Sequence, residues 1–307
     1  CHGLDHMDLS GRKGRVSSAK CGTCHPQQVK EFAASKHRVA MDTLEKNARY
    51  LALPKEIRLK NCVSCHKIGE YDEWDGSRGR CDSCHRRHAF SSADAARPRA
   101  CGRCHSGAEQ PQYESYLFSK HTVLEGTMAR AARKPSCDTC HMADRNHNVS
   151  LGIAHDLDGQ PLPPDDFKQR REQMAAQCMR CHSKWFVDAD FKASDAILRR
   201  SREALDKAQK AIAQAEADGL LGEHLKNAKP NPVTGKLLEL GPNMLTSPTD
   251  PRILQEFFRL KQVHYPGTWK AAYHNGPDYL RTRGWEPLNQ SCQAILDELK
   301  RLREQKR

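Results

Sequence analysis

The 307-residue sequence has few of the side chains that usually form a protein core. Hydrophobic residues make up 37% of the chain and aromatic residues 6%, and the mean hydropathy is −0.81. A chain of this length normally buries a larger apolar fraction, so side chains alone predict a poor core. The sequence also lacks any run of 18 apolar residues, which excludes a membrane-spanning helix.

Cysteine, in contrast, is abundant and regularly spaced. Of the 14 cysteines, 12 fall in six Cys-x-x-Cys-His motifs, and the other two are Cys1 and Cys292. Such a pattern argues against a disordered chain. Paired cysteines also occur in zinc ribbons and disulfide frameworks, but neither needs a histidine directly after each second cysteine. Attachment of haem c does, because two thiols add to the porphyrin vinyl groups and the adjacent imidazole binds the iron.

The motifs therefore predict six covalent haems and their proximal iron ligands. Their starts are 19 to 41 residues apart, so the chain should wind closely around a stack of flat, apolar cofactors that form most of the core. The predicted attachment residues are Cys21, Cys24, Cys62, Cys65, Cys81, Cys84, Cys101, Cys104, Cys137, Cys140, Cys178 and Cys181. The predicted proximal ligands are His25, His66, His85, His105, His141 and His182.

The net charge of +12 has a different meaning once these cofactors are counted. Each haem carries two propionates, so six haems add about −12 when all are ionised. We therefore interpret the basic side chains as counter-charge and solvated surface, and expect no nucleic-acid partner. A basic funnel that attracts a small anion such as nitrite is the alternative.

A second histidine on an iron makes a haem low-spin and suited to electron transfer, whereas an iron without one is open to substrate. Several histidines follow the motifs at short distances. The predicted distal ligands of this kind are His37, His88, His121 and His147.

The last third of the sequence changes character. Residues 194–222, 252–264 and 288–307 have helical patterns, and the proline-rich segment 227–251 reads as loop. Cys292 on the last helix is expected to be a small packed residue. We predict a mainly α fold with little strand, divided into a multihaem region over 1–190 and a helical region over 191–307.

The stretch from Cys81 to Gly107 resembles the octahaem hydroxylamine oxidoreductase family. Ser119-Lys120-His121, Cys140-His141-Met142 with His147-Asn148, and Gly284-Trp285 with Asn289 also match it. The resemblance covers essentially the whole chain. It implies eight haems, one of them catalytic with an open iron, and trimers built through C-terminal helices.

Against that family, Cys1-His2 looks like the end of a further attachment motif, with His2 as proximal and His6 as distal ligand. This would be a seventh haem, with an eighth upstream. The alternative is a lipoprotein that begins at an acylated cysteine. The resemblance also makes His264 or His274 the remaining distal ligand and Cys62, Cys65 and His66 the site of the open haem.

The pocket residues of the family are replaced here. Its crosslinking tyrosine falls on Arg281, its Asp-His pair on Glu109-Gln110, and a further tyrosine near Asp158, with His155 close by. Gln110 cannot titrate, and Arg281 would attract an anion. A register shift that places Tyr279 at the crosslinking position is the alternative.

These departures favour reduction of nitrite or hydroxylamine at the open haem. The rival hypothesis is an electron-transfer subunit, all of whose haems form a wire beside a catalytic paralogue. Hydroxylamine oxidation is a third hypothesis and requires Tyr279. Expected partners are a small nitrogenous substrate, a redox cytochrome or quinone-linked protein, and further copies or a paralogue in a homotrimer or hetero-oligomer. Because haem c is attached outside the cytoplasm, we expect a periplasmic or extracellular protein, delivered by a signal peptide absent from this sequence.

Overall fold

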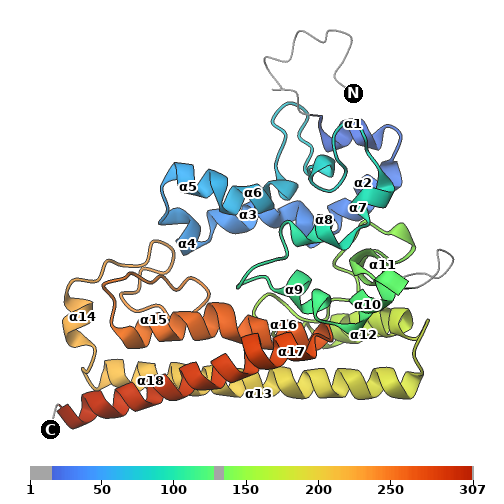
Figure 1. Cartoon of the computed structure of the whole chain (residues 1–307). Helices are drawn as coiled ribbons and strands as arrows, with labels where there is room; N and C mark the ends of the chain where they lie inside the picture. Colours follow the sequence, from blue (N-terminus) through green and yellow to red (C-terminus); the bar gives the residue numbers. More distant parts are fainter. Residues whose placement is uncertain (1–15, 128–134, 306–307) are drawn as a thin grey trace.

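The computed structural model describes residues 16–127 and 135–305 and shows a helical protein (Figure 1). Within these ranges there is no β-strand, and extended pairing is limited to two isolated bridges, Tyr71 with Arg78 and His155 with Pro161. This confirms the predicted mainly α fold with little strand. No helix in the described ranges is both long enough and apolar enough to cross a membrane.

The chain up to residue 178 forms short helices joined by loops. They are α1 (Ser18–Gly22), α2 (Pro26–Ala33), η1 (Lys36–Val39), α3 (Ala40–Glu45), α4 (Ala48–Leu51), α5 (Lys55–Lys60), α6 (Cys62–His66), η2 (Lys67–Gly69), η3 (Cys81–Ser83), α7 (Ser92–Ala95), α8 (Pro98–Gly102), α9 (Gln112–Leu117), α10 (Lys120–Thr127), α11 (Cys137–His141), η4 (Ala143–Arg145) and α12 (Pro164–Cys178).

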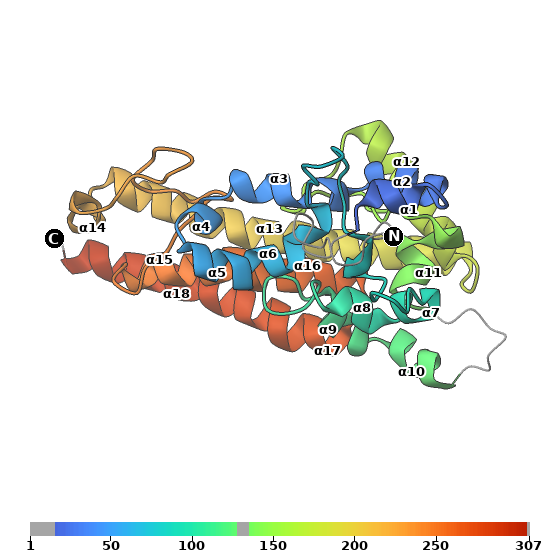
Figure 2. The same ribbon diagram turned by 90° about the horizontal axis from the view of Figure 1, so that it is seen from above.

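The rest of the chain forms a bundle of longer helices. They are α13 (Lys184–Ala217), α14 (Gly222–Lys226), α15 (Arg252–Arg259), the π-helix η5 (Leu260–His264), α16 (Tyr265–Tyr273), α17 (Pro277–Tyr279), the π-helix η6 (Leu280–Trp285) and α18 (Glu286–Gln305). In Figure 1, α13 runs along the base, α15 to α16 run back, and α18 returns beside α13. The short helices lie over this bundle (Figure 2).

Helix α13 shows how the sequence specifies the bundle. Ser183 caps its start by accepting a hydrogen bond from the Phe186 backbone N–H. Its end is a left-handed Gly219 (φ 66°), and the backbone N–H of Leu220 donates to the Ala215 carbonyl, as in a Schellman motif. From Leu198 on, buried residues recur every three to four positions and form one largely apolar stripe, which packs against the other bundle helices: Leu198, Ser201, Leu205, Ala208, Ile212 and Ala215.

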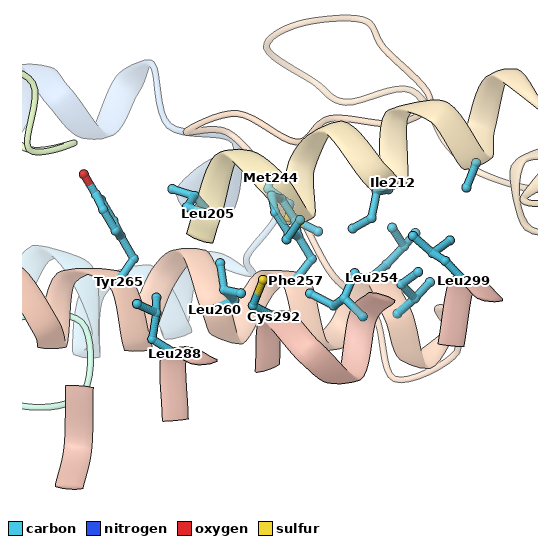
Figure 3. Close-up of a cluster of buried hydrophobic side chains, with 14 of the residues drawn as sticks. Leu205, Ile212, Met244, Leu254, Phe257, Leu260, Tyr265, Leu288, Cys292 and Leu299 are labelled. Carbon is cyan, nitrogen blue, oxygen red and sulfur yellow. The ribbon is translucent and has the colours of Figure 1, made fainter. Parts of the chain in front are cut away.

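The hydrophobic core lies in this bundle. Leu254 and Phe257 of α15, Leu260 of η5, and Leu288 of the α18 helix pack against the α13 stripe (Figure 3). Cys292 also lies in this core, and its thiol approaches the Ala204 carbonyl at 3.4 Å. The predicted role of Cys292 as a small packed residue agrees with this position.

The part before α13 is packed differently. Its buried hydrophobic side chains in the described ranges are few, and three of the five are alanines: Leu44, Ala48, Ala100, Tyr116 and Ala154. Large apolar side chains are exposed instead, among them Trp74 (64%) and Leu157 (80%). Contacts between side chains therefore cannot account for how these short helices hold together.

The helices of the last third begin and end at other residues than the sequence predicts. The helix expected over 194–222 begins ten residues earlier, at Lys184, and ends at Ala217, while the segment 252–264 ends in a π-helical turn. The last helix begins at Glu286, and residues 306–307 of its predicted range lie outside the described residues. Helix α13 crosses the predicted boundary at residue 190 without a break, and the division into 1–190 and 191–307 stays a prediction.

Candidate haem sites and catalytic pocket

Each Cys-x-x-Cys-His motif forms a tight turn of backbone. In the motifs that begin at Cys21, Cys81, Cys101 and Cys178, the histidine N–H donates to the carbonyl of the first cysteine at 2.9–3.0 Å. This hydrogen bond spans one helical turn, so the first thiol and the imidazole lie on the same face of the chain. Local backbone geometry therefore presents both groups to one ligand.

The motifs adjoin one another through their thiols. Burial and the neighbouring Cys21 thiol raise the pKa of Cys81, and burial and the Cys65 thiol raise the pKa of Cys104. A hydrogen bond between the thiols of Cys101 and Cys137 lowers the pKa of Cys101 and raises the pKa of Cys137.

Two further neighbours complete this set of contacts. Burial, with Cys101 nearby, raises the pKa of Cys84 to about 11, and burial, with Cys178 nearby, raises the pKa of Cys140 to about 11. The motifs at Cys21, Cys81, Cys101, Cys137 and Cys178 thus follow one another in space, and the motif at Cys62 joins the one at Cys101. Once a haem is attached, each cysteine sulfur is a thioether that does not titrate, but the motifs adjoin one another in either form.

Four motif histidines face a second histidine from a distant part of the chain. The ring centroids of His105 and His37 are 6.0 Å apart, and those of His141 and His274 are 6.2 Å apart. The other two pairs, His85 with His147 and His182 with His121, each have centroids 6.3 Å apart.

This spacing fits a metal between the rings. Each imidazole nitrogen lies about 2 Å from a metal that it binds, and the ring centre about 1 Å farther, so two imidazoles on opposite sides of one metal have centroids about 6 Å apart. The described residues thus fit four haem irons with two histidines each, and these rings would hold them.

Hydrogen bonds from Nδ1 leave the other ring nitrogen available. The Lys270 carbonyl oxygen lies 2.7 Å from His274 Nδ1, and the Ala40 carbonyl oxygen lies 2.7 Å from His66 Nδ1. Because a carbonyl can only accept, these nitrogens carry the proton and Nε2 is the nitrogen left for a metal. Burial lowers the pKa of His105 and of His141 to about 4, which keeps these rings neutral as a metal ligand requires.

Two motif histidines, His25 and His66, have no ring facing them in the described part of the chain. The further motif residues Cys1 and His2, and the distal ligand His6 predicted for that motif, lie outside the described residues. His264 faces none of the motif histidines within the described ranges, and its buried Nδ1 lacks a hydrogen-bond partner there. His88 has a left-handed backbone conformation (φ 66°), and its role as a ligand stays a prediction.

The predicted pocket pair Glu109-Gln110 lies between two cations that sequence reasoning missed. Arg49 of α4 forms an ion pair with the Glu109 carboxylate at 2.7 Å. Lys270 of α16 is only 6% exposed, and its ammonium donates to the Glu109 carbonyl at 3.1 Å and to Gln110 Oε1 at 3.3 Å. Burial lowers the pKa of Lys270 to about 8.

His155 and Asp158 contact the same helix, α16, through its tyrosine and tryptophan side chains. His155 contacts the rings of Phe167, Trp269 and Tyr273 at centroid distances of 5.3–6.4 Å, and the Asp158 carbonyl accepts a hydrogen bond from the Tyr265 hydroxyl at 2.9 Å. Burial and Arg171 nearby lower the pKa of His155 to about 4. Helix α16 therefore gathers four of the predicted pocket residues around itself.

Arg281 does not join them. Its guanidinium pairs with Glu286 at 3.0 Å and is 62% exposed. Tyr279 packs on Phe118, with centroids 6.1 Å apart. One signal in the sequence could have pointed to Lys270, which is the sole charged residue in the apolar run Tyr265–Tyr273 and stands four residues before a histidine.

Comparison with known proteins agrees with this arrangement. The family described as "Seven times multi-haem cytochrome CxxCH" matches residues 12–230. A probable nitrite reductase-hydroxylamine oxidoreductase fusion protein of Kuenenia stuttgartiensis is 25% identical over 295 residues, which cover 78% of this chain. The chain spans about a third of that protein's length, 33%.

Two solved structures have the same fold. One is a reducing HAO-like protein complex of Kuenenia stuttgartiensis (TM-score 0.75, 21% identity, 94% of this chain and 72% of that one). The other is a hypothetical multihaem protein (TM-score 0.76, 18% identity, 95% of this chain and 80% of that one). The predicted resemblance is confirmed, and the family implies binding of haem c. The chain belongs to the multihaem cytochrome CxxCH family, and its relatives are hydroxylamine-oxidoreductase-like.

Proposed function

We propose that this chain reduces nitrite or hydroxylamine at one open haem, held by Cys62, Cys65 and His66, and that the other haems supply the electrons. Each of the six motifs attaches one haem c in this proposal. His37, His121, His147 and His274 are the distal ligands of four of them. A seventh haem at Cys1-His2, with His6 as a nearby distal ligand, and an eighth upstream belong to the same proposal.

The observation that carries this proposal is the pairing of the histidines. Four motif histidines face a second ring, but His66 does not in the described chain, and neither His155 nor His274 supplies one. His66 is nevertheless oriented, because Ala40 holds its Nδ1 at 2.7 Å. An iron with one free position can bind a small substrate and pass electrons to it, which is the chemistry that haem supplies when bound.

The cations around the predicted pocket pair Glu109-Gln110 favour an anion. Ala40, which holds His66, begins α3, and Arg49 follows on α4 with its side chain at Glu109. Lys270 has three ammonium donors and uses two of them on Glu109 and Gln110. Arginine and lysine hydrogen bond strongly to nitrogen oxyanions, whereas Gln110 cannot remove protons as hydroxylamine oxidation requires.

Electrons reach the open site through the neighbouring motif. Cys65 adjoins Cys104, and its thiol lies 3.9 Å from the Arg103 carbonyl. The motif at Cys101 in turn adjoins those at Cys81 and Cys137. The branch at Cys62 is therefore attached to the middle of a continuous series of motifs.

The second candidate is a non-catalytic electron-transfer subunit. The exposed position of Arg281 favours it, because the predicted anion-binding side chain does not reach the pocket. Hydroxylamine oxidation would require Tyr279 at a porphyrin, and one neighbour of this tyrosine is the Phe118 ring. Either role suits a homotrimer or a hetero-oligomer with a paralogue, a redox cytochrome or quinone-linked partner, and a periplasmic or extracellular location.

Electron paramagnetic resonance of the oxidised holoprotein tests the proposal. We expect a high-spin ferric signal that changes when nitrite is added, and uniformly low-spin signals would instead support the electron-transfer subunit. Arg49→Gln should weaken nitrite binding about tenfold, which corresponds to about 1.4 kcal/mol. Arg281→Gln is the matched control and should leave nitrite affinity unchanged.

A further inference from the structure

Glu31 is a half-buried carboxylate beside a predicted iron ligand. It lies on α2, six residues after His25, and its side chain is 16% exposed. Its Oε2 accepts the backbone N–H of His147 at 2.9 Å and lies 3.7 Å from His147 Nδ1. A glutamate carboxyl group is ordinarily ionised at neutral pH, and here its oxygen accepts a hydrogen bond, so the group is anionic.

The loop before His147 depends on such an anchor. Asp144 and Arg145 both have left-handed backbone conformations (φ 56° and 63°), which residues other than glycine rarely adopt. The Arg145 carbonyl lies 2.9 Å from His147 Nδ1. Glu31 and Arg145 thus fix the ring that faces His85, and Glu31 places a negative charge beside it.

Lys270 places a positive charge beside the next motif of the series, the one that begins at Cys101. Its ammonium donates to Glu109 and Gln110, four to five residues after His105, and its carbonyl accepts from His274. It therefore lies between the pair His105/His37 and the pair His141/His274. The acceptors of the ammonium are a carbonyl and an amide, and the nearby Glu109 carboxylate pairs with Arg49. Its positive charge is only partly compensated.

These two charges act in opposite directions on an iron. Reduction removes one positive charge from the metal, so a nearby anion stabilises the oxidised form and a nearby cation stabilises the reduced form. A carboxylate at the Nδ1 side of a ligand also makes the ligand more basic, which favours the oxidised metal further.

We propose that the fixed charges of Glu31 and Lys270 create a difference in reduction potential, here called the potential step, within the series of haems. Glu31 holds the haem between His85 and His147 at a low potential. Lys270 holds the haems at His105 and His141 at higher potentials. Because the motif at Cys101 adjoins the one at Cys62, the step directs electrons toward the proposed open site. The inference rests on the proposed axial pairs but not on catalysis.

A spectroelectrochemical titration of the intact holoprotein, without substrate, tests this step. Glu31→Gln should move one low-spin midpoint upward and change the low-spin resonance of that haem. Lys270→Gln should move one or two midpoints downward. The conservative variants Glu31→Asp and Lys270→Arg keep the charge and should restore midpoints close to those of the wild type.

Matched controls remove an exposed charge of the same sign. Glu45→Gln on α3 and Lys300→Gln on α18 should leave every midpoint in place. Unmoved midpoints in both test variants, or shifts equal to those of the controls, would overturn the proposal. The result is independent of nitrite, so failure of nitrite to bind at His66 would contradict the proposed function and leave the potential step standing.

Discussion

At the scale of single residues, two histidines of the C-terminal bundle look alike in sequence and differ in the structure. His274 is half-buried, faces His141 at a ring-centroid distance of 6.2 Å, and donates from Nδ1 to the Lys270 carbonyl. His264, at the end of a π-helical turn, has neither contact in the described chain. The environment of Nδ1 therefore separates a candidate iron ligand from a packed histidine.

This difference gives a spectroscopic prediction. His274→Ala removes one of the two rings proposed to bind the iron at His141, so one haem should change from low-spin to high-spin in the oxidised protein. Electron paramagnetic resonance measures this change directly.

His264→Ala is the matched control for that experiment. It should leave the number of low-spin haems unchanged, because its ring faces no motif histidine in the described ranges. A new high-spin signal in this variant, with none from His274→Ala, would show that His264 and not His274 binds the iron.

At the scale of elements, the close approach of α16 and η6 holds the pocket helix in place. A Cβ atom on Gly284 would lie 2.7 Å from the Thr268 Cα and 2.9 Å from its backbone nitrogen. Backbone atoms cannot move aside as a flexible side chain can, so this crossing needs glycine. The same α16 carries Trp269 and Lys270 and is followed directly by His274, so its position sets theirs.

We expect Gly284→Ala to destabilise the bundle by about 1–3 kcal/mol, because the added methyl group must push α16 away from η6. A lower thermal midpoint of the helical circular dichroism signal would show this effect.

The matched glycine is Gly222, where an added Cβ atom would meet nothing within 4 Å. Gly222→Ala should keep the midpoint of the wild type. Equal midpoints for Gly284→Ala and Gly222→Ala would mean that the contact between α16 and η6 is looser than the structure shows.

At the scale of the whole molecule, the two parts of the chain are stabilised in different ways. The bundle has a continuous apolar core from α13, α15, η5 and α18. The short helices before it are four to eight residues long in most cases, which is too short to be stable alone, and they bury few apolar side chains. In the proposed arrangement, porphyrin faces joined to the chain at the motifs would supply the packing surface that these helices lack.

This contrast predicts the behaviour of the polypeptide made without haem. Amide hydrogen exchange should show protection in the core helices α13, α15 and α18, and exchange close to the unfolded rate from α1 to α11. The reason is that cofactor binding and folding are coupled wherever the cofactor forms the core. Strong protection of α3 and α8 without haem would contradict this account.

The sequence alone was sufficient for the class of the protein. Spacing within Cys-x-x-Cys-His is a local property, so the motifs from Cys21 to His182 identify a haem c protein, and the helical periodicity of the last third predicts the bundle. The shortage of apolar residues already indicated a core made largely of cofactor. Boundaries such as Lys184 were less accurate, because caps and packing decide where a helix begins.

Only the tertiary structure decided which side chains meet. His37 and His105, or His85 and His147, are far apart in sequence, and no local pattern states that their rings face each other. The sequence placed Arg281 in the pocket, whereas the fold turns it to Glu286 and brings Lys270 to Gln110. The physical reason is that iron coordination and buried charge depend on distances across the molecule, which chain folding sets and sequence neighbours do not.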